Sequence, residues 1–136
     1  MAFHPYLFFG GDCRQAFTRY QEVFGGDLTL IAMGDMPPGE QAPDVPPELI
    51  AHAALVLGDG YLMGSDDPTT GSFGPVQGMQ VSCSLADPGE ARRVFDGLAE
   101  GGQVTMPITE TSWASAFGMC VDRFGTPWMV GAEAPR

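Results

Sequence analysis

Residues 122–133 read Asp-Arg-Phe-Gly-Thr-Pro-Trp-Met-Val-Gly-Ala-Glu, and the organisation of the chain can be worked out from them. The first four residues are polar and contain a glycine, which predicts a turn. Thr126 to Val130 is apolar and follows that turn, which predicts a short strand. A similar sequence occurs earlier, where Gly58-Asp59-Gly60 precedes Tyr61-Leu62-Met63. This echo suggests that one structural unit is built twice.

The first copy begins with an aromatic segment, residues 3–10, which predicts a strand. Asp12 is expected to cap a helix, with Gln15 completing a capping box, and Gly25 is expected to end the helix. Residues 34–48 contain five prolines, which exclude a regular helix or a strand in the middle of a sheet. The remaining strands of this copy are predicted at residues 28–33, 50–57 and 61–65, and residues 66–77 are expected to form a linker.

The second copy repeats this order of elements. Asp87 is expected to cap a helix that has Pro88 at its first position and Glu90 completing the capping box. Gly101 is the expected stop. Strands are predicted at residues 79–85, 104–106, 115–121 and 126–130.

The repeat can be checked by its offset. Asp12 and Asp87 are 75 residues apart, and Gly25 and Gly101 are 76 residues apart. Each copy therefore reads strand–helix–strand–strand–strand. We predict an α+β fold in which two βαβββ modules, residues 1–70 and 76–136, form a single domain, 1–136. A pseudo-twofold relation between the modules would give a curved mixed sheet with a cleft, where a ligand could bind.

The composition excludes several classes of protein. The 136 residues carry a net charge of −11, and all six basic residues are arginines. Nucleic-acid binding needs a basic surface, so no nucleic acid is expected, and no anionic membrane either. The apolar runs are shorter than the ~20 residues of a membrane helix, and the N-terminus lacks a signal-peptide pattern. Three widely spaced cysteines, Cys13, Cys83 and Cys120, are expected to be reduced, which favours a cytoplasmic location.

Five motifs carry a family resemblance that covers the whole chain. They are Pro5-Tyr6-Leu7-Phe8-Phe9, Gly34-Asp35-Met36-Pro37, Leu62-Met63-Gly64-Ser65-Asp66, Phe117-Gly118-Met119 and Asp122 to Met129. The sequence resembles the vicinal oxygen chelate superfamily, and within it the PhnB-like group, whose members often carry the label 3-demethylubiquinone-9 3-methyltransferase. The resemblance implies the glyoxalase/bleomycin resistance/dihydroxybiphenyl dioxygenase fold and a homodimer.

The resemblance also implies positions for a divalent metal, near Pro5, Met63, Gln80 and Met129. Of these side chains only Gln80 could serve as a ligand, because proline cannot ligate and thioether sulfur suits soft copper. His4 is one residue away from the ligand position and is expected on the opposite face of its strand. His52 is expected to be structural and Glu133 to be exposed. We therefore expect no metal and no other cofactor; the alternative is a divalent metal held through His4 in a shifted register.

The cleft implied by the resemblance would be apolar and rich in methionine and aromatic side chains. Catalysis would need an acid, base or nucleophile there, and Asp66, Glu110, Ser82 and Cys120 are candidates without a visible partner. Strand alternation would add Ser84 to the same face. The residues expected to line the cleft are Leu7, Phe9, Met63, Ser65, Gln80, Ser82, Trp113, Phe117, Met119 and Met129.

Two functions of different classes follow from this pattern. The first is a metal-free binding protein for a small hydrophobic or aromatic molecule, as bleomycin-resistance members are. The second is an enzyme, either metal-dependent like the lyases and dioxygenases of the superfamily or the methyltransferase that the family label claims. One alternative is that the same side chains fill the cleft and no ligand binds, and a weaker one is a stress-linked dimeric module with no small-molecule role.

Overall fold

The computed structural model describes residues 1–41, 44–58, 60–67 and 76–133. The chain divides into two compact units, Met1–Phe73 and Gly74–Arg136, and each is described by itself. Most of the predicted linker, and Asp59 of the predicted turn, lie outside the described residues. That the two units form a single domain stays a prediction.

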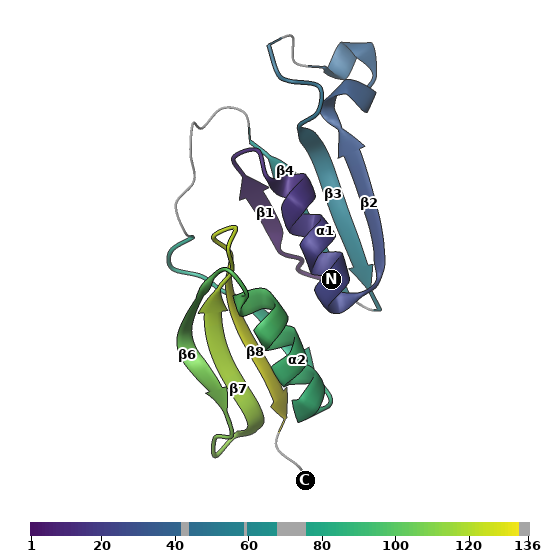
Figure 1. The fold of residues 1–136 in the computed structure, drawn as a ribbon. Helices are drawn as coiled ribbons and strands as arrows, with labels where there is room; N and C mark the ends of the chain where they lie inside the picture. Colours follow the sequence, from purple (N-terminus) through teal and green to yellow (C-terminus); the bar gives the residue numbers. More distant parts are fainter. Residues whose placement is uncertain (42–43, 59, 68–75, 134–136) are drawn as a thin grey trace. The chain divides into compact units, whose positions relative to one another are not determined.

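Among its described residues, each unit contains one α-helix and four strands (Figure 1). The order strand–helix–strand–strand–strand occurs twice, so the predicted pair of βαβββ modules is confirmed. Both helices have 12 residues, and none of the helices among the described residues is long and apolar enough to cross a membrane. The elements of the first unit are β1 (Tyr6–Phe9), α1 (Cys13–Phe24), β2 (Asp27–Ala32), β3 (Ile50–Leu57) and β4 (Gly60–Asp66); those of the second are β5 (Val81–Leu85), α2 (Pro88–Ala99), β6 (Gln103–Thr109), β7 (Ala114–Val121) and β8 (Pro127–Glu133).

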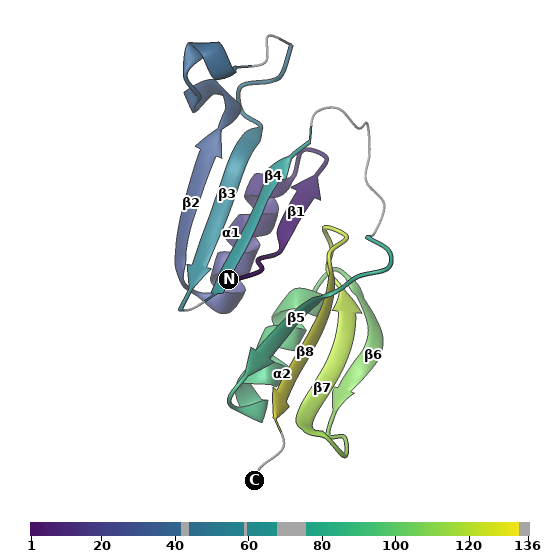
Figure 2. The same cartoon turned by 180° about the vertical axis from the view of Figure 1, so that it is seen from behind.

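The two sheets share one topology. The strand order is β1-β4-β3-β2 in the first unit and β5-β8-β7-β6 in the second (Figure 2). The first strand of each unit pairs in parallel with the last, and the other pairs are antiparallel. Parallel strands need a crossover connection, and the helix supplies one in each unit, where it connects β1 to β2 and β5 to β6. The first and last strands of each unit can therefore be parallel neighbours.

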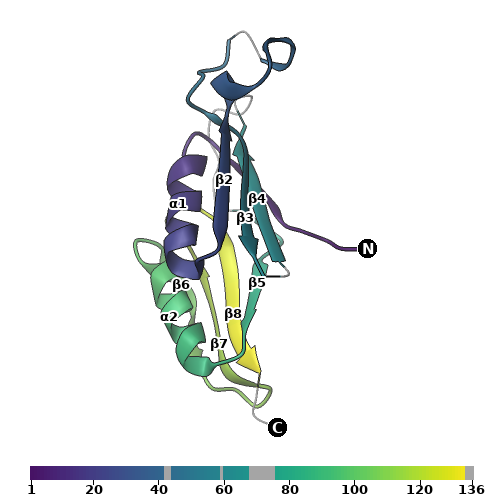
Figure 3. The ribbon, with the colours of Figure 1, turned by 90° about the vertical axis from the view of Figure 1, so that its right-hand side faces the viewer.

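In the first unit, α1 covers one face of its sheet (Figure 3). Its apolar residues recur with the helical period, and Phe17 and Tyr20 are fully buried. Gly64 of β4 permits the close approach of the helix, because a Cβ there would lie 2.8 Å from the Phe17 ring. Gly25 ends α1 with a φ of 77°, a value that glycine adopts readily. The buried side chains on the sheet side of this core are Leu7, Phe9, Ala53, Leu55 and Leu62.

In the second unit, α2 covers its sheet in the same way (Figure 1). Val94, Phe95 and Leu98 of α2 are buried. Gly101 follows the last turn with a φ of 77°, as the sequence predicts. The buried side chains on the sheet side are Ala116, Cys120, Trp128, Val130 and Ala132.

A buried carboxylate from another strand caps α1, and the predicted capping box at Asp12 is wrong. The Asp12 side chain makes no capping hydrogen bond. Asp66, at the end of β4, is 3% exposed, and its Oδ1 accepts hydrogen bonds from the backbone N–H groups of Gly11 and Cys13. Its Oδ2 accepts one from Ile50 N–H at the start of β3. Asp66 therefore ties the helix start to two strands, which local sequence could not reveal.

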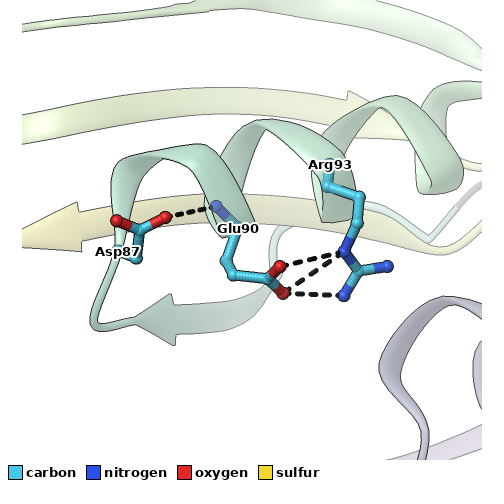
Figure 4. Close-up of polar contacts among 3 residues, drawn as sticks. All are labelled: Asp87, Glu90 and Arg93. Carbon is cyan, nitrogen blue, oxygen red and sulfur yellow. Dashed lines mark hydrogen bonds and ion pairs between the residues drawn. The ribbon is translucent and has the colours of Figure 1, made fainter.

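The cap of α2 is local, as predicted (Figure 4). The Asp87 carboxylate accepts a hydrogen bond of 2.9 Å from Glu90 N–H, and Pro88 occupies the first helical turn. Glu90 does not complete the predicted capping box, because its carboxylate binds the Arg93 guanidinium one turn later, at 2.9 Å. Only half of the predicted box therefore forms.

The turn at residues 122–126 is organised by a second buried carboxylate. Asp122 is 5% exposed, and its Oδ1 accepts hydrogen bonds from Phe124 N–H and Thr126 N–H. Its Oδ2 accepts one of 2.9 Å from Trp128 Nε1, which orients the largest side chain of this core. Gly125 has a φ of 92°, which the turn requires. The predicted turn and strand are both confirmed.

The proline-rich segment contains no regular helix or strand among its described residues. It forms two short 3₁₀ turns, Met33–Asp35 and Pro38–Glu40. Gln41 holds this segment together, because its amide donates hydrogen bonds to the carbonyls of Gly34 and Met36. The predicted irregular segment is therefore confirmed over its described part.

We predict that Asp122→Ala destabilises the second unit far more than Asp87→Ala. The first change removes the acceptor of three N–H donors, two of them buried, at a cost of about 3 kcal/mol or more. The second removes one exposed capping bond, at a cost of about 1 kcal/mol. Urea unfolding followed by tryptophan fluorescence, which reports on Trp128, measures both changes, and equal losses would contradict the role given to Asp122.

Candidate functional site

Each sheet has one face that its own helix does not cover, here called the open face of that unit (Figures 2 and 3). Paired residues on neighbouring strands point to the same face, so the strand register decides which side chains lie there. A residue that pairs with a helix-facing position also faces the helix and is therefore not on the open face. The residues that alternate with these positions along each strand are on the open face. The open faces are the surfaces that the candidate site residues can occupy.

On the open face of the first unit, four paired residues cross the sheet in one row. Tyr6 of β1 pairs with Met63 of β4, Met63 with Ala54, and Ala54 with Thr29. In the next row Phe8 pairs with Ser65. Phe8 is 56% exposed, whereas Ser65 is 7% exposed, so the hydroxyl of Ser65 lies under larger neighbours.

On the open face of the second unit, three methionines lie side by side. Ser82 of β5 pairs with Met129 of β8, Met129 with Met119 of β7, and Met119 with Met106 of β6. In the adjacent row Ser84 pairs with Gly131, and Gly131 with Phe117, so Ser84 shares this face as predicted. The Phe117 ring packs edge-on against Trp113, with 5.9 Å between their centres. Trp113 is 64% exposed, so this surface combines flexible thioethers with an accessible aromatic ring.

The structure places most of the predicted site residues on the open faces. Ser82, Phe117, Met119 and Met129 share one face, as predicted, and Trp113 contacts Phe117. Met63 and Ser65 lie on the open face of the first unit. Gln80 is exposed and immediately precedes β5. That these residues bind a ligand stays a prediction.

The prediction that Leu7 and Phe9 share a face with Met63 is wrong. Leu7 pairs with Gly64, which faces α1, and the Phe9 ring packs 6.1 Å from Phe17 of that helix. The first strand is apolar on both faces, so alternation along the sequence could not reveal which face is buried. Sequence reasoning therefore missed Tyr6, Phe8, Tyr61 and Met106, and only the strand pairing identifies them.

The predicted placement of His4 is also wrong. Its ring packs edge-on against Tyr61, 4.9 Å away, and Tyr61 pairs with Val56 on the open face. His4 therefore lies on the open-face side, and not on the opposite face as expected. The Nδ1 atom of His52 lies 3.1 Å from the Tyr6 hydroxyl, and the two rings stack at 5.7 Å. Both histidines thus belong to aromatic contacts on this face.

The donors at the superfamily's metal positions do not fit a hard divalent ion. The positions expected from the resemblance carry Pro5, Met63, Gln80 and Met129, and the strand register pairs Met63 with Tyr6 and Met129 with Ser82, which adds a phenol and a hydroxyl. Magnesium, zinc and iron are held in such enzymes by imidazole and carboxylate groups. Among the described residues, no group of three or more histidine, cysteine, aspartate or glutamate side chains could hold a metal ion. Whether the protein binds a metal stays a prediction.

The structure gives structural roles to the candidate acids. The carboxylates of Asp66 and Asp122 accept backbone and indole N–H groups on the buried side of the fold. Glu110 and Glu133 are exposed. Carboxylates that accept backbone hydrogen bonds are already engaged, so Asp66 and Asp122 do not act as acids or bases on the open faces, where His52 and Tyr6 form a hydrogen-bonded pair of titratable side chains.

The cysteines are buried thiols and not activated nucleophiles. Burial, together with the charge of Asp66, raises the pKa of Cys13 to about 12. Burial, together with the charge of Asp122, raises the pKa of Cys120 to about 11. Burial also raises the pKa of Cys83. Since the thiolate is the reactive form, none of the three is poised for nucleophilic catalysis at neutral pH.

We predict that the raised thiol pKa values make the protein less stable in alkali. The ordinary value is 9.0, so the unfolded chain loses these protons first, and the free energy of unfolding falls as the pH rises from about 9 to about 12. Urea titrations across this range measure the effect. Cys13→Ala should flatten the dependence, and an unchanged slope in this variant would contradict the assignment to Cys13.

Comparison with known proteins agrees with this architecture. The family model described as 3-demethylubiquinone-9 3-methyltransferase matches residues 1–131. Protein YjdN of Escherichia coli K12 is 34% identical over 139 residues, which covers 96% of this chain and 94% of YjdN. Protein PA1353 of Pseudomonas aeruginosa, of known crystal structure, is 41% identical with a TM-score of 0.88, and the match covers 98% of each chain.

A more distant structure identifies the fold. The glyoxylase/bleomycin resistance protein/dioxygenase domain from Frankia sp. EAN1pec is 15% identical, with a TM-score of 0.67, and the match covers 98% of this chain and 92% of that domain. The glyoxalase/bleomycin resistance fold predicted from the sequence is therefore confirmed. The chain belongs to the 3-demethylubiquinone-9 3-methyltransferase (PhnB-like) family and has the fold of glyoxalase/bleomycin resistance proteins.

Proposed function

We propose that this chain binds a small hydrophobic or aromatic molecule through the open faces of its sheets, without a metal. The observation that carries the proposal is the row Ser82, Met129, Met119 and Met106, together with Tyr6 and Met63 in the first unit. Methionine side chains are flexible and polarisable, so a surface built from them adapts to flat apolar ligands. The expectation that the ligand lies in a cleft between the modules stays a prediction.

The polar groups on these faces suit recognition better than catalysis. Ser82 and Ser84 are exposed hydroxyls beside Met129 and Phe117, and each can give or accept one hydrogen bond. A ligand with an apolar body and one or two polar substituents would match such a surface. This chemistry favours binding or carriage of the molecule over its transformation.

A second candidate function is enzymatic, and the description of the family favours it. Methyl transfer from S-adenosylmethionine is usually served by a doubly wound parallel sheet with a glycine-rich first turn. The described sheets are mostly antiparallel, and β1 and β5 are not followed by a Gly-x-Gly-x-x-Gly sequence. Calorimetric titration with S-adenosylmethionine, and with zinc, nickel and magnesium ions, tests this candidate directly.

A homodimer and a cytoplasmic location also belong to this proposal. Exposed rings such as Phe8 and Tyr61 offer apolar surface to a second copy or to a ligand. The described cysteines are unpaired, which suits a reducing compartment. Sedimentation velocity at several protein concentrations would give the oligomeric state.

We predict saturable binding of the neutral fluorescent probe N-phenyl-1-naphthylamine. Bound probe should accept energy from Trp113, which is exposed beside Phe117, so tryptophan emission falls as probe emission rises. Trp113→Phe should lower this transfer and leave the buried Trp128 as the remaining donor. No saturable response would overturn the proposal.

We further predict that Phe117→Ala and Met129→Gln each weaken probe binding about tenfold, because each removes apolar contact worth over 1 kcal/mol. Val104→Ala is the matched control. Val104 is 45% exposed but pairs with the buried Cys120, so it lies on the α2 side of the sheet. An equal loss of affinity in all three variants would place the probe elsewhere.

A further inference from the structure

Five aromatic rings cluster on the open face of the first unit, and we call them the aromatic patch: His4, Tyr6, Phe8, His52 and Tyr61. Tyr6 lies 5.3 Å from Phe8 and 5.7 Å from His52, measured between ring centres. His4 lies 4.9 Å from Tyr61. The rings come from the N-terminal segment and from β1, β3 and β4, whose open face Figure 2 shows.

The strand order shows that these ring contacts belong to one continuous surface. β4 lies between β1 and β3, so the bond from Tyr6 to His52 crosses over β4. The residue beneath it is Ser65, which explains why that side chain is 7% exposed although it faces away from α1. Met63 is in register with Tyr6 and two residues from Tyr61, so it joins the two groups of rings. The aromatic patch therefore presents ring faces and ring edges around the thioether of Met63.

The rings remain accessible in the unit that carries them. The exposed fractions are 56% for Phe8, 45% for Tyr61 and 39% for Tyr6. Exposed rings in such number are unusual for a surface that contacts only water, and they mark a binding surface. The chemistry of the occupant then depends on the charges around the patch.

The guanidinium groups of the described arginines are placed away from this face. The chain has no lysine, and none of the described arginines is on a strand. Arg14 and Arg19 are on α1, Arg92 and Arg93 on α2, and the Arg123 guanidinium lies 5.2 Å over the Phe124 ring in the turn. An anionic ligand on the open face would therefore find no guanidinium among the described residues.

Negative charge lies at the edge of the same face. Asp27 of β2 pairs with Val56, and Val56 pairs with Tyr61, so this carboxylate occupies the row of Tyr61. Asp27 is exposed. The net charge of −11 adds a field over the whole surface that attracts cations and repels anions.

We propose that the aromatic patch selects aromatic ligands that carry a positive charge, such as an ammonium group on a flat ring system. The face of an aromatic ring attracts a cation within about 6 Å of its centre, and Tyr6, Phe8 and Tyr61 offer such faces. The Asp27 carboxylate, at the edge of the sheet, would help to neutralise the positive charge of such a ligand. This inference rests on the proposed function, and it adds that the ligand carries a positive charge.

Three naphthalenes that differ in charge test the proposal by calorimetric titration of the full chain. The probes are 2-naphthylmethylammonium, neutral 2-naphthalenemethanol and anionic 2-naphthoate. We expect the cation to bind roughly fivefold to tenfold more tightly than the alcohol, and the anion to bind most weakly. In about 0.5 M NaCl, which screens the net charge, a preference of at least about threefold should remain, because short-range ring contacts are screened little.

Leucine variants separate the ring effect from apolar contact. Tyr61→Leu and Phe8→Leu should keep the affinity for the alcohol within about threefold and reduce the preference for the cation, because leucine retains apolar contact without a π-system. Thr29→Val on the same face is the matched control and should keep the preference, because it leaves every ring in place.

The outcomes distinguish this inference from the proposed function. If the alcohol and the ammonium bind equally, or if the preference survives both aromatic-to-leucine changes, the aromatic patch does not select charge, whereas the binding function stands. If none of the three probes binds, the proposed function fails and the inference fails with it.

Discussion

A four-stranded sheet with a single helix can bury only one of its two faces, and this constraint governs both units of the chain. α1 and α2 bury their apolar stripes against one face each, and the cores that result contain the largest buried side chains, Phe17, Tyr20 and Trp128. The opposite faces still carry methionine and aromatic side chains. Exposed apolar faces of this kind are typical of surfaces that bind a partner or a ligand.

The two buried aspartates show how the units secure their helix-side cores. Asp66 links β4 to the start of α1 and to β3, and Asp122 links a turn to the indole of Trp128. In both cases one carboxylate accepts three N–H groups that the fold would otherwise leave unpaired. Because these acids support the fold, they are not available for chemistry on the open faces. The surface that remains on the open faces is suited to the binding of apolar molecules.

Sequence alone predicted the element order and the repeat with few errors, because helix stops at glycine and turns at Asp-x-x-Gly are local signals. It failed at two kinds of position. The cap of α1 comes from Asp66, more than 50 residues away, and no local pattern encodes such a bond. The faces of β1 were reversed, because Leu7 and Phe9 look like Tyr6 and Phe8 in hydrophobicity, and only pairing with β4 separates them. Met119 and Met129 pair with each other, and β7 alternates strictly between buried and half-buried residues, a pattern that local sequence can reveal.

If the proposed function is correct, the open faces, and no other surface, receive the ligand. Nuclear magnetic resonance of the protein labelled at its methionine methyl groups can show where neutral 2-naphthalenemethanol binds. Met63, Met106, Met119 and Met129 lie on the open faces, while Met33 and Met36 lie in the proline-rich segment. The account predicts saturable shifts for methyl groups of the first set and none for the second. Unchanged methyl signals on the open faces at saturating probe, or equal shifts in both sets, would contradict it.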